Sequence, residues 1–275
     1  MSTSKDESNY LHGYSADEQD RLYRQAGQLE HVVHDRLPYR RTRNLLEVGC
    51  GVGAQTEILL RRFPSLRVTG VDRSPESLEK ARENLALRKW TGDRFELVES
   101  PAESLPFDSD TFDGAFLCWV LEHVSDPLRV LSEVRRCLRP GSPIVVSEVQ
   151  NATFFIDPYS PHTLAYWTAF NEHQIEIGGD PFVGAKLGNL LQAVGFGNIT
   201  TEVKTFLLDN RQPGERKEFL SYWTELLLSG AAELERGGKV PTELVEGMKN
   251  ELEIVGRDPN AVFFYSFVQA QARTS

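Results

Sequence analysis

The sequence predicts an α/β fold with one mostly parallel sheet and helices on both of its faces. Three observations predict it. Short apolar runs alternate with helical segments from Asn44 to Val149, a glycine-rich turn follows the first run, and 275 residues are enough for one large domain with insertions. Alternation at this spacing is typical of βαβ units, whose crossovers are right-handed. A ligand site is therefore expected at the carboxyl ends of the strands.

The composition argues against several classes of function. A formal charge of −10 argues against a general nucleic-acid binder, because such proteins need a basic surface to displace counterions from phosphates. Cys50, Cys118 and Cys137 have no CxxC spacing, so neither a disulfide framework nor a metal site is predicted. No run is apolar enough for a signal peptide or a membrane span. We therefore expect a soluble, cytoplasmic protein that acts on a small molecule without metal, membrane or nucleic acid.

Residues 1–40 are expected to form an N-terminal arm and a leading helix, followed by the main domain at 41–275. Ser15 lies three residues before Glu18, which is the spacing of a capping box. Apolar residues then recur at helical intervals, at Leu22, Ala26, Leu29 and Val32. The polar arm before this helix suits either an exposed segment or one exchanged between the subunits of a homo-oligomer.

Strands and helices then alternate along the chain. Strands are expected at 44–48 (NLLEV), 66–72 (LRVTGVD), 95–99 (FELVE), 112–120 (FDGAFLCWV) and 142–149 (SPIVVSEV), with helices at about 54–62, 75–87 and 128–138. Helical insertions are expected at about 151–195 and 213–256, the first with a helix at about 163–175. Two further strands are expected at 199–208 and 261–272.

The turn after the first strand carries three glycines at alternate positions, Gly49, Gly51 and Gly53. Such a turn lets backbone amides and a helix N-terminus approach a nucleotide-like ligand without Cβ clashes. With Ala54 in the sixth position, the pattern is also compatible with the GxGxxA variant of the dinucleotide fingerprint. Glu47 argues for a different ligand, because a carboxylate two residues before the first glycine repels a pyrophosphate and attracts a cation.

Asp72 is the second signal, because a carboxylate at the end of the second strand accepts both hydroxyls of a ribose, as it also does in NAD sites. The motif EVGCGVG, Asp72 and the later segments PAESLPF and CLRPGSPIVVSE occur in one order between about residues 44 and 150. Together they resemble the class I S-adenosylmethionine-dependent methyltransferases, in particular the UbiE-like (type 11) branch. The resemblance implies a Rossmann-like fold with a mostly parallel seven-stranded sheet and a helical lid.

The resemblance also implies a cofactor site for S-adenosylmethionine, with S-adenosylhomocysteine as the product. It places Glu47 at the amino-acid end of the cofactor, Gly49, Gly51 and Gly53 beside the sugar, Asp72 on the ribose, Arg73 along the adenine, and Cys118 beside the methionyl part. A solvated Arg73 is the alternative. Ser74 is open to a purely structural role as the cap of the next helix.

The adenine contact departs from the family pattern. Members of this branch have an acid in a D-A-x-x-L-P-F context, and this chain has Pro101 in its place. Adenine recognition would then rest on the backbone amide of Ala102, with Glu103 as a substitute acceptor.

Aromatic residues are concentrated after the fifth strand, between Phe154 and Phe182. We expect a pocket for an apolar or aromatic methyl acceptor there. Its candidate residues are Phe155, Tyr159, Tyr166, Trp167 and Phe170, together with Tyr14 from the N-terminal arm. Tyr14, with Tyr10 and His12 in the N-terminal arm, is expected to close over the cofactor. For any one of these side chains, packing within the protein is the alternative.

A catalytic base is needed only if the attacking atom loses a proton. His123 and His162 are the candidate catalytic residues, with His173 and Glu148 as further candidate bases. A structural or surface role is the alternative for each histidine. A second aromatic group, Phe219, Tyr222 and Trp223, shares a helical face and is interpreted first as core or interface.

The leading hypothesis is a methyltransferase for a small apolar or aromatic molecule. The layout resembles bacterial natural-product tailoring enzymes, and C-methylation of a prenylated indole of the teleocidin-pathway kind is one specific hypothesis. N- or O-methylation of another small metabolite stays open. An NAD-dependent oxidoreductase and a non-catalytic cofactor-binding protein are the alternatives from other classes.

Overall fold

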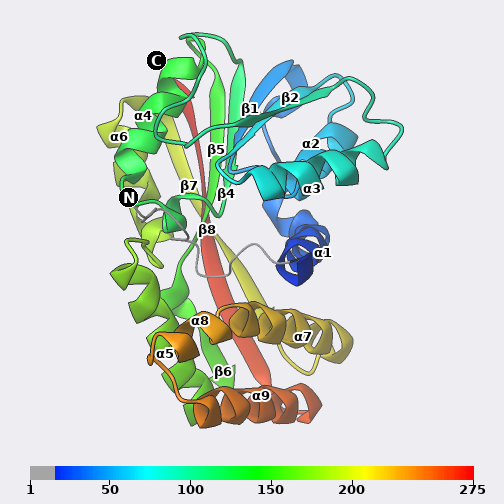
Figure 1. Ribbon diagram of the computed structural model, residues 1–275, viewed down its shortest axis with the longest axis vertical. Helices are drawn as coiled ribbons and strands as arrows, with labels where there is room; N and C mark the ends of the chain where they lie inside the picture. The colour runs from blue at the N-terminus through cyan, green and yellow to red at the C-terminus, as the bar shows by residue number, and fades with distance from the viewer. Residues whose placement is uncertain (1–15) are drawn as a thin grey trace, which may run out of the picture.

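The computed structural model describes residues 16–275, in which one eight-stranded sheet is surrounded by helices (Figure 1). The strands are β1 (Asn44–Val48), β2 (Arg67–Asp72), β3 (Phe95–Glu99), β4 (Gly114–Cys118), β5 (Pro143–Val149), β6 (Phe155–Asp157), β7 (Phe196–Leu208) and β8 (Val262–Thr274). Their order is β3-β2-β1-β4-β5-β8-β6, and β7 pairs with β8. The predicted fold class is confirmed. The eighth strand is β6, which at three residues is too short to give an alternating pattern in the sequence.

The helices follow the predicted alternation. They are α1 (Ala16–Val33), α2 (Ala54–Arg62), α3 (Pro75–Ala86), α4 (Pro127–Cys137), α5 (Pro161–Glu176), α6 (Leu187–Ala193), α7 (Pro213–Ser229), α8 (Ala231–Arg236) and α9 (Thr242–Arg257). Ser74 caps α3, as predicted, because its side chain accepts the amide of Ser77 at 3.0 Å. Tyr10, His12, Tyr14 and Ser15 lie outside the described residues. No helix within 16–275 is both long and apolar enough to cross a membrane.

The parallel strands β1 to β5 form the buried centre of the sheet. α2 and α3 lie on one side of it and α4 and α6 on the other (Figure 1). Leu45 packs into one apolar layer and Leu46 into the other, and Phe116 and Leu117 divide in the same way. This alternation follows from the pleat of a strand, which points successive side chains to opposite faces. Both layers exclude water, so the strands place their carboxyl ends at one well-defined edge.

Antiparallel β8 carries the sheet beyond that edge. Val149, the last residue of β5, is opposite Phe267, so β8 residues 262–266 extend past the end of β5. They pair there with β6 on one side and with β7 on the other. The helices α5, α7, α8 and α9 are grouped around this extension, and α1 lies between them and the parallel strands (Figure 1). The helices α5, α7, α8 and α9 therefore lie beyond the carboxyl ends of β1, β2 and β4.

Candidate functional site

A cavity of about 260 Å³ lies where the strand order reverses, between β1 and β4. Ligands of open α/β sheets bind at such a switch point, outside the carboxyl ends of the strands. The ends of β1, β2 and β4 form one side of the cavity, and residues of α1, α5, α7, β7 and β8 form the other. One space is thus bounded by the glycine turn and by the helical insertions.

The three glycines of the turn have positive φ angles of 70°, 50° and 75°, and each meets a different steric demand. A Cβ on Gly49 would lie 2.5 Å from a methyl carbon of Val120, so this glycine lets the loop after β4 approach. A Cβ on Gly51 would meet no atom within 4 Å, because the backbone faces the cavity there. Gly53 does not line the cavity. It begins α2, and its Cβ would press on Ala81 of α3 at 3.1 Å.

Asp72 connects the glycine turn to the end of β2. Its Oδ2 accepts the Gly51 amide at 2.8 Å and its Oδ1 accepts the Ser74 amide at 2.9 Å. Burial raises the pKa of Asp72, and these two amides act in the opposite direction. A carboxylate has about four lone-pair positions, so both oxygens keep capacity to accept a further hydroxyl. The carboxylate lines the cavity in a fixed orientation that suits a vicinal diol.

Glu47 lies behind the turn and not among the residues that line the cavity. The carboxyl is buried and accepts the hydroxyl of Thr56 at 2.7 Å. Burial raises the pKa of Glu47 to about 8, and the charge of Asp72 contributes in the same direction. The Glu47 carboxyl is therefore separated from the cavity by the turn, and its charge depends on pH near neutrality.

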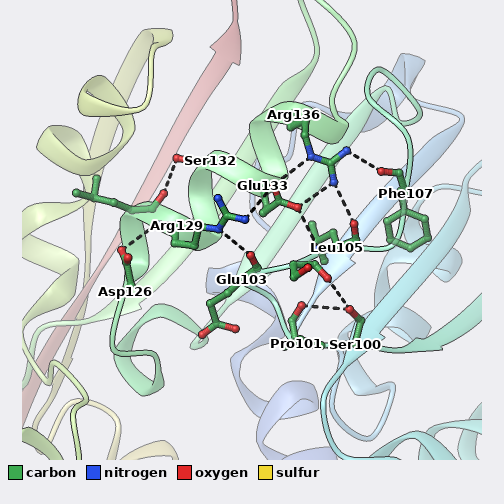
Figure 2. Close-up of polar contacts among 12 residues, drawn as sticks. Ser100, Pro101, Glu103, Leu105, Phe107, Asp126, Arg129, Ser132, Glu133 and Arg136 are labelled. Atoms are coloured by element: carbon green, nitrogen blue, oxygen red, sulfur yellow. Dashed lines mark hydrogen bonds and ion pairs between the residues drawn. The ribbon is translucent and has the colours of Figure 1, made fainter.

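The segment after β3 forms the far end of this side of the cavity. Ser100, Ala102 and Glu103 line it, and Arg73 does so from the end of β2. No other described residue forms a hydrogen bond with the Glu103 carboxylate, and Figure 2 shows this side chain turned away from α4.

Side chains of α4 fix the backbone of this segment (Figure 2). Arg129 donates to the Glu103 carbonyl at 3.0 Å, and Arg136 donates to the Leu105 carbonyl at 3.0 Å. Glu133 accepts the Leu105 amide at 3.1 Å. The sequence analysis missed these three residues, although their spacing along α4 places them on one face of the helix. Their contacts fix the backbone at Glu103 and Leu105, in the segment where Pro101 replaces the acid of the family pattern.

Two of the five described residues of the predicted aromatic pocket lie at this cavity, and the predicted Tyr14 is outside the described residues. Trp167 and Phe170 line the cavity. Phe155 and Tyr159 do not, and they are 53% and 77% exposed. Tyr166 is fully buried away from it, with its hydroxyl donating to the Leu227 carbonyl at 2.6 Å. The reason is that α5 is surrounded on several sides by protein, so most of its aromatic rings serve packing.

The main aromatic wall comes instead from α7. Its cavity-lining residues are Phe219, Tyr222, Trp223 and Leu226. Their spacing of three, four and seven residues from the first places them on one stripe of the helix. Rings of β7 and β8 continue the wall, with ring centroids 4.6 Å apart for Phe206 and Phe219 and 4.8 Å apart for Trp223 and Tyr265. The sequence showed the stripe, but not that it faces a cavity.

A buried ion pair on α1 also lines the cavity. Arg21 donates to Glu18 through Nε at 2.7 Å and through Nη2 at 2.5 Å. It also donates to Gln25 at 2.7 Å. The predicted capping box of Glu18 involves Ser15, which lies outside the described residues; within them, the Glu18 side chain pairs with Arg21. The bidentate geometry leaves this wall polar but nearly neutral.

His123 is the candidate base that the structure places at the cavity. It ends the short 3₁₀ turn Leu121–His123 after β4. Burial lowers the pKa of His123, with the nearby Glu122 acting in the opposite direction. A neutral imidazole in this position is able to accept a proton.

The other candidate bases lie elsewhere. His162 is on the surface of α5, 2.7 Å from Glu251 of α9, and does not line the cavity. Glu148 is fully buried behind the cavity wall and accepts the amides of Val120 and Leu121 at 2.9 and 2.6 Å. It therefore positions the loop that carries His123. His173 is buried in α5 and does not line the cavity either.

Cys118 lines the cavity at the end of β4. Burial raises the pKa of its thiol well above the usual value, so the thiol keeps its proton at neutral pH and is a poor nucleophile. Residues 16–275 contain no cluster of three or more His, Cys, Asp or Glu side chains that could hold a metal ion. The donor set instead suits a nucleoside, with an open glycine backbone beside a carboxylate that has room for two hydroxyls.

Comparison with known proteins agrees with this geometry. Residues 46–146 match the family model described as a methyltransferase domain. The O-methyltransferase cnsE of Penicillium expansum is 32% identical over 178 residues, which cover 64% of this chain and 58% of that protein. The ubiquinone/menaquinone biosynthesis C-methyltransferase UbiE of Geotalea daltonii is 29% identical over 128 residues, which cover 46% of this chain and 54% of that protein.

The fold has close parallels among solved structures. Phosphoethanolamine N-methyltransferase 2 of Haemonchus contortus, in complex with S-adenosyl-L-methionine, has a TM-score of 0.57 at 18% identity over 98% of this chain and 58% of that one. An identity this low shows the fold alone. The chain spans between 33% and 62% of the length of the first curated relatives that it matches.

Proposed function

We propose, on the premise that this chain carries a class I S-adenosylmethionine-dependent methyltransferase domain of the UbiE-like type, that it methylates a small apolar or aromatic molecule. One observation carries the proposal. A single cavity joins the glycine turn and Asp72 to an aromatic wall, so a nucleoside and an apolar acceptor would meet in the same space.

The side of the cavity near β1 and β2 suits the methyl donor. Asp72 would hold the ribose, Gly51 would let the sugar approach the backbone, and Arg73, Ala102 and Glu103 would surround the adenine. When bound, S-adenosylmethionine supplies an electrophilic methyl group on a sulfonium. The protein then has to align the two reactants and keep water out, which are large contributions to a displacement reaction.

The opposite side of the cavity suits the acceptor. Rings of α7 and β8 provide flat apolar surface, and aromatic faces also stabilise positive charge that develops on an acceptor. His123 is the residue that would accept a proton where the acceptor has to lose one. His162 does not line the cavity and is paired with Glu251 on the surface, so we assign it no catalytic role.

C-methylation of a prenylated indole in natural-product biosynthesis is the specific reaction that we favour. An alkene carbon would bond to the methyl group as the methyl–sulfur bond breaks, with that electron pair left on sulfur. The resulting carbocation would then lose a proton to give a neutral product, and the aromatic wall is suited to stabilise it until then. The names of the relatives include both C- and O-methyltransferases, so N- or O-methylation of another small metabolite is the alternative within the same class.

Transfer of a labelled methyl group tests the proposal. The protein is incubated with S-adenosylmethionine labelled in the methyl group and with pools of prenylated indoles, phenols, quinols and amines. We expect label in an organic-extractable product from at least one pool, and S-adenosylhomocysteine in equal amount. Binding of the donor without product from any pool would instead support a non-catalytic cofactor-binding protein.

A further inference from the structure

The hydroxyl of Tyr222 has no hydrogen-bond partner among the described residues, although the side chain is only 6% exposed and lines the cavity. Two other polar groups on the aromatic wall are paired. Tyr265 donates to Asn151 at 2.9 Å, and Trp167 donates to the Asn151 carbonyl at 3.1 Å. Buried polar groups are nearly always paired, so an unpaired hydroxyl at a cavity points to a ligand.

Within the described residues, the same helix carries a second unpaired hydrogen-bond donor, on Trp223, but only the Tyr222 hydroxyl is accessible to a ligand in the cavity. The indole N–H of Trp223 has no partner within residues 16–275, but that atom is sealed from solvent. A ligand in the cavity cannot reach it without a rearrangement. The Tyr222 hydroxyl is not among these sealed, unpaired atoms.

The charged groups around Tyr222 determine what kind of partner fits. Burial raises the pKa of the Tyr222 phenol, so the hydroxyl keeps its proton at neutral pH and is able to donate it in a hydrogen bond. The groups that influence this pKa include Arg21, Glu122 and Glu18. Arg21 is paired with Glu18, and the remaining carboxyl of Glu122 disfavours an anionic ligand.

We infer that the methyl acceptor carries an uncharged oxygen, as a carbonyl or hydroxyl group, that accepts a hydrogen bond from Tyr222 while its apolar body lies against the α7 and β8 rings. This inference rests on the proposed function, since it describes the acceptor of that reaction. It makes Tyr222 a residue that determines specificity and orients the acceptor.

A pair of probe molecules tests the inference without the natural acceptor. 1-Tetralone and tetralin share a bicyclic body and differ by one carbonyl oxygen. Three of the four tryptophans, Trp119, Trp167 and Trp223, line the cavity, so fluorescence quenching reports binding. Each probe is titrated into the protein with and without S-adenosylhomocysteine. We expect Tyr222→Phe to weaken binding of 1-tetralone about three- to tenfold and to leave binding of tetralin unchanged.

Tyr159→Phe is the matched control, because it removes the same hydroxyl from a residue that is 77% exposed and outside the cavity. It should leave both affinities unchanged. The inference is overturned if Tyr222→Phe weakens both probes equally, if it weakens neither, or if the wild-type protein binds neither. The titration without S-adenosylhomocysteine does not depend on cofactor binding. If the protein fails to bind the cofactor, the proposed function is contradicted, but this titration still shows whether Tyr222 contacts the probe.

Discussion

At the scale of single residues, the site depends on where each carboxyl group lies relative to the cavity. Asp72 faces the cavity and is held by two backbone amides, whereas Glu47 stands behind the glycine turn and shares a hydrogen bond with Thr56. Glu148 is deeper still and fixes the loop after β4. The three groups are all acidic, but they differ in whether a ligand touches them, so their substitution should have different effects.

Asp72→Ala should weaken binding of S-adenosylmethionine by roughly 1.5–3 kcal/mol, since it removes a charged acceptor for two ribose hydroxyls. Titration calorimetry measures the change. Glu79→Ala is the control, because Glu79 is an exposed acid on the neighbouring helix α3, paired only with Arg82. An affinity that Asp72→Ala leaves unchanged would refute the ribose contact.

The raised pKa of Glu47 predicts that the affinity for S-adenosylmethionine depends on pH. With a pKa raised to about 8, the carboxyl of the free protein carries a proton at neutral pH. A cationic ligand nearby favours the ionised form, so binding releases this proton. Affinity for S-adenosylmethionine should therefore rise with pH up to about 8 and level off above it.

Calorimetry across that range checks the prediction, with Glu47→Gln as the comparison. The variant lacks the titrating carboxyl and should keep only the pH dependence of the ligand itself. If the affinity of both proteins depends on pH in the same way, the ionisation of Glu47 is not coupled to binding of the cation.

At the scale of elements, the acceptor side depends on α7 more than on the aromatic-rich α5. α7 presents one stripe of apolar residues to the cavity, while α5 is enclosed by other parts of the chain. The two helices have similarly aromatic sequences, so burial alone does not tell them apart. What distinguishes them is that rings of α7 pack against Phe206 of β7 and Tyr265 of β8, which complete the aromatic wall.

Phe219→Ala should weaken binding of tetralin about tenfold, because it removes a ring that packs against Phe206 and lines the cavity. Phe155→Ala, at an exposed position of strand β6, should leave this binding unchanged. Fluorescence titration of both variants measures the difference. A larger loss of tetralin affinity for Phe155→Ala would instead place the acceptor pocket in the aromatic segment after β5, as the sequence predicted.

At the scale of the whole molecule, the sheet and the donor side were predictable because they are local. Each strand and helix between Asn44 and Val149 has its own periodicity, and the glycine turn and Asp72 lie directly after strands. The acceptor side combines α1, α5, α7 and β8, which are far apart in the chain. No local pattern tells which face of an apolar helix meets a cavity, so the sequence predicts neither that Tyr166 is buried away from the cavity nor that Tyr222, which is part of the core, also lines it.

The extension of β8 beyond the parallel strands explains how these distant parts converge. It carries β6 and β7 with it and supports the helices that stand above the glycine turn. The buried pair of Glu18 and Arg21 on α1 closes the space between the two halves. Such long-range assembly is set by tertiary packing.

The most direct test of this account is the choice of cofactor, measured by titration calorimetry with S-adenosylmethionine and with NAD under the same conditions. The account predicts saturable binding of S-adenosylmethionine that Asp72→Ala weakens, and no binding of NAD. Saturable binding of NAD without binding of S-adenosylmethionine would contradict it.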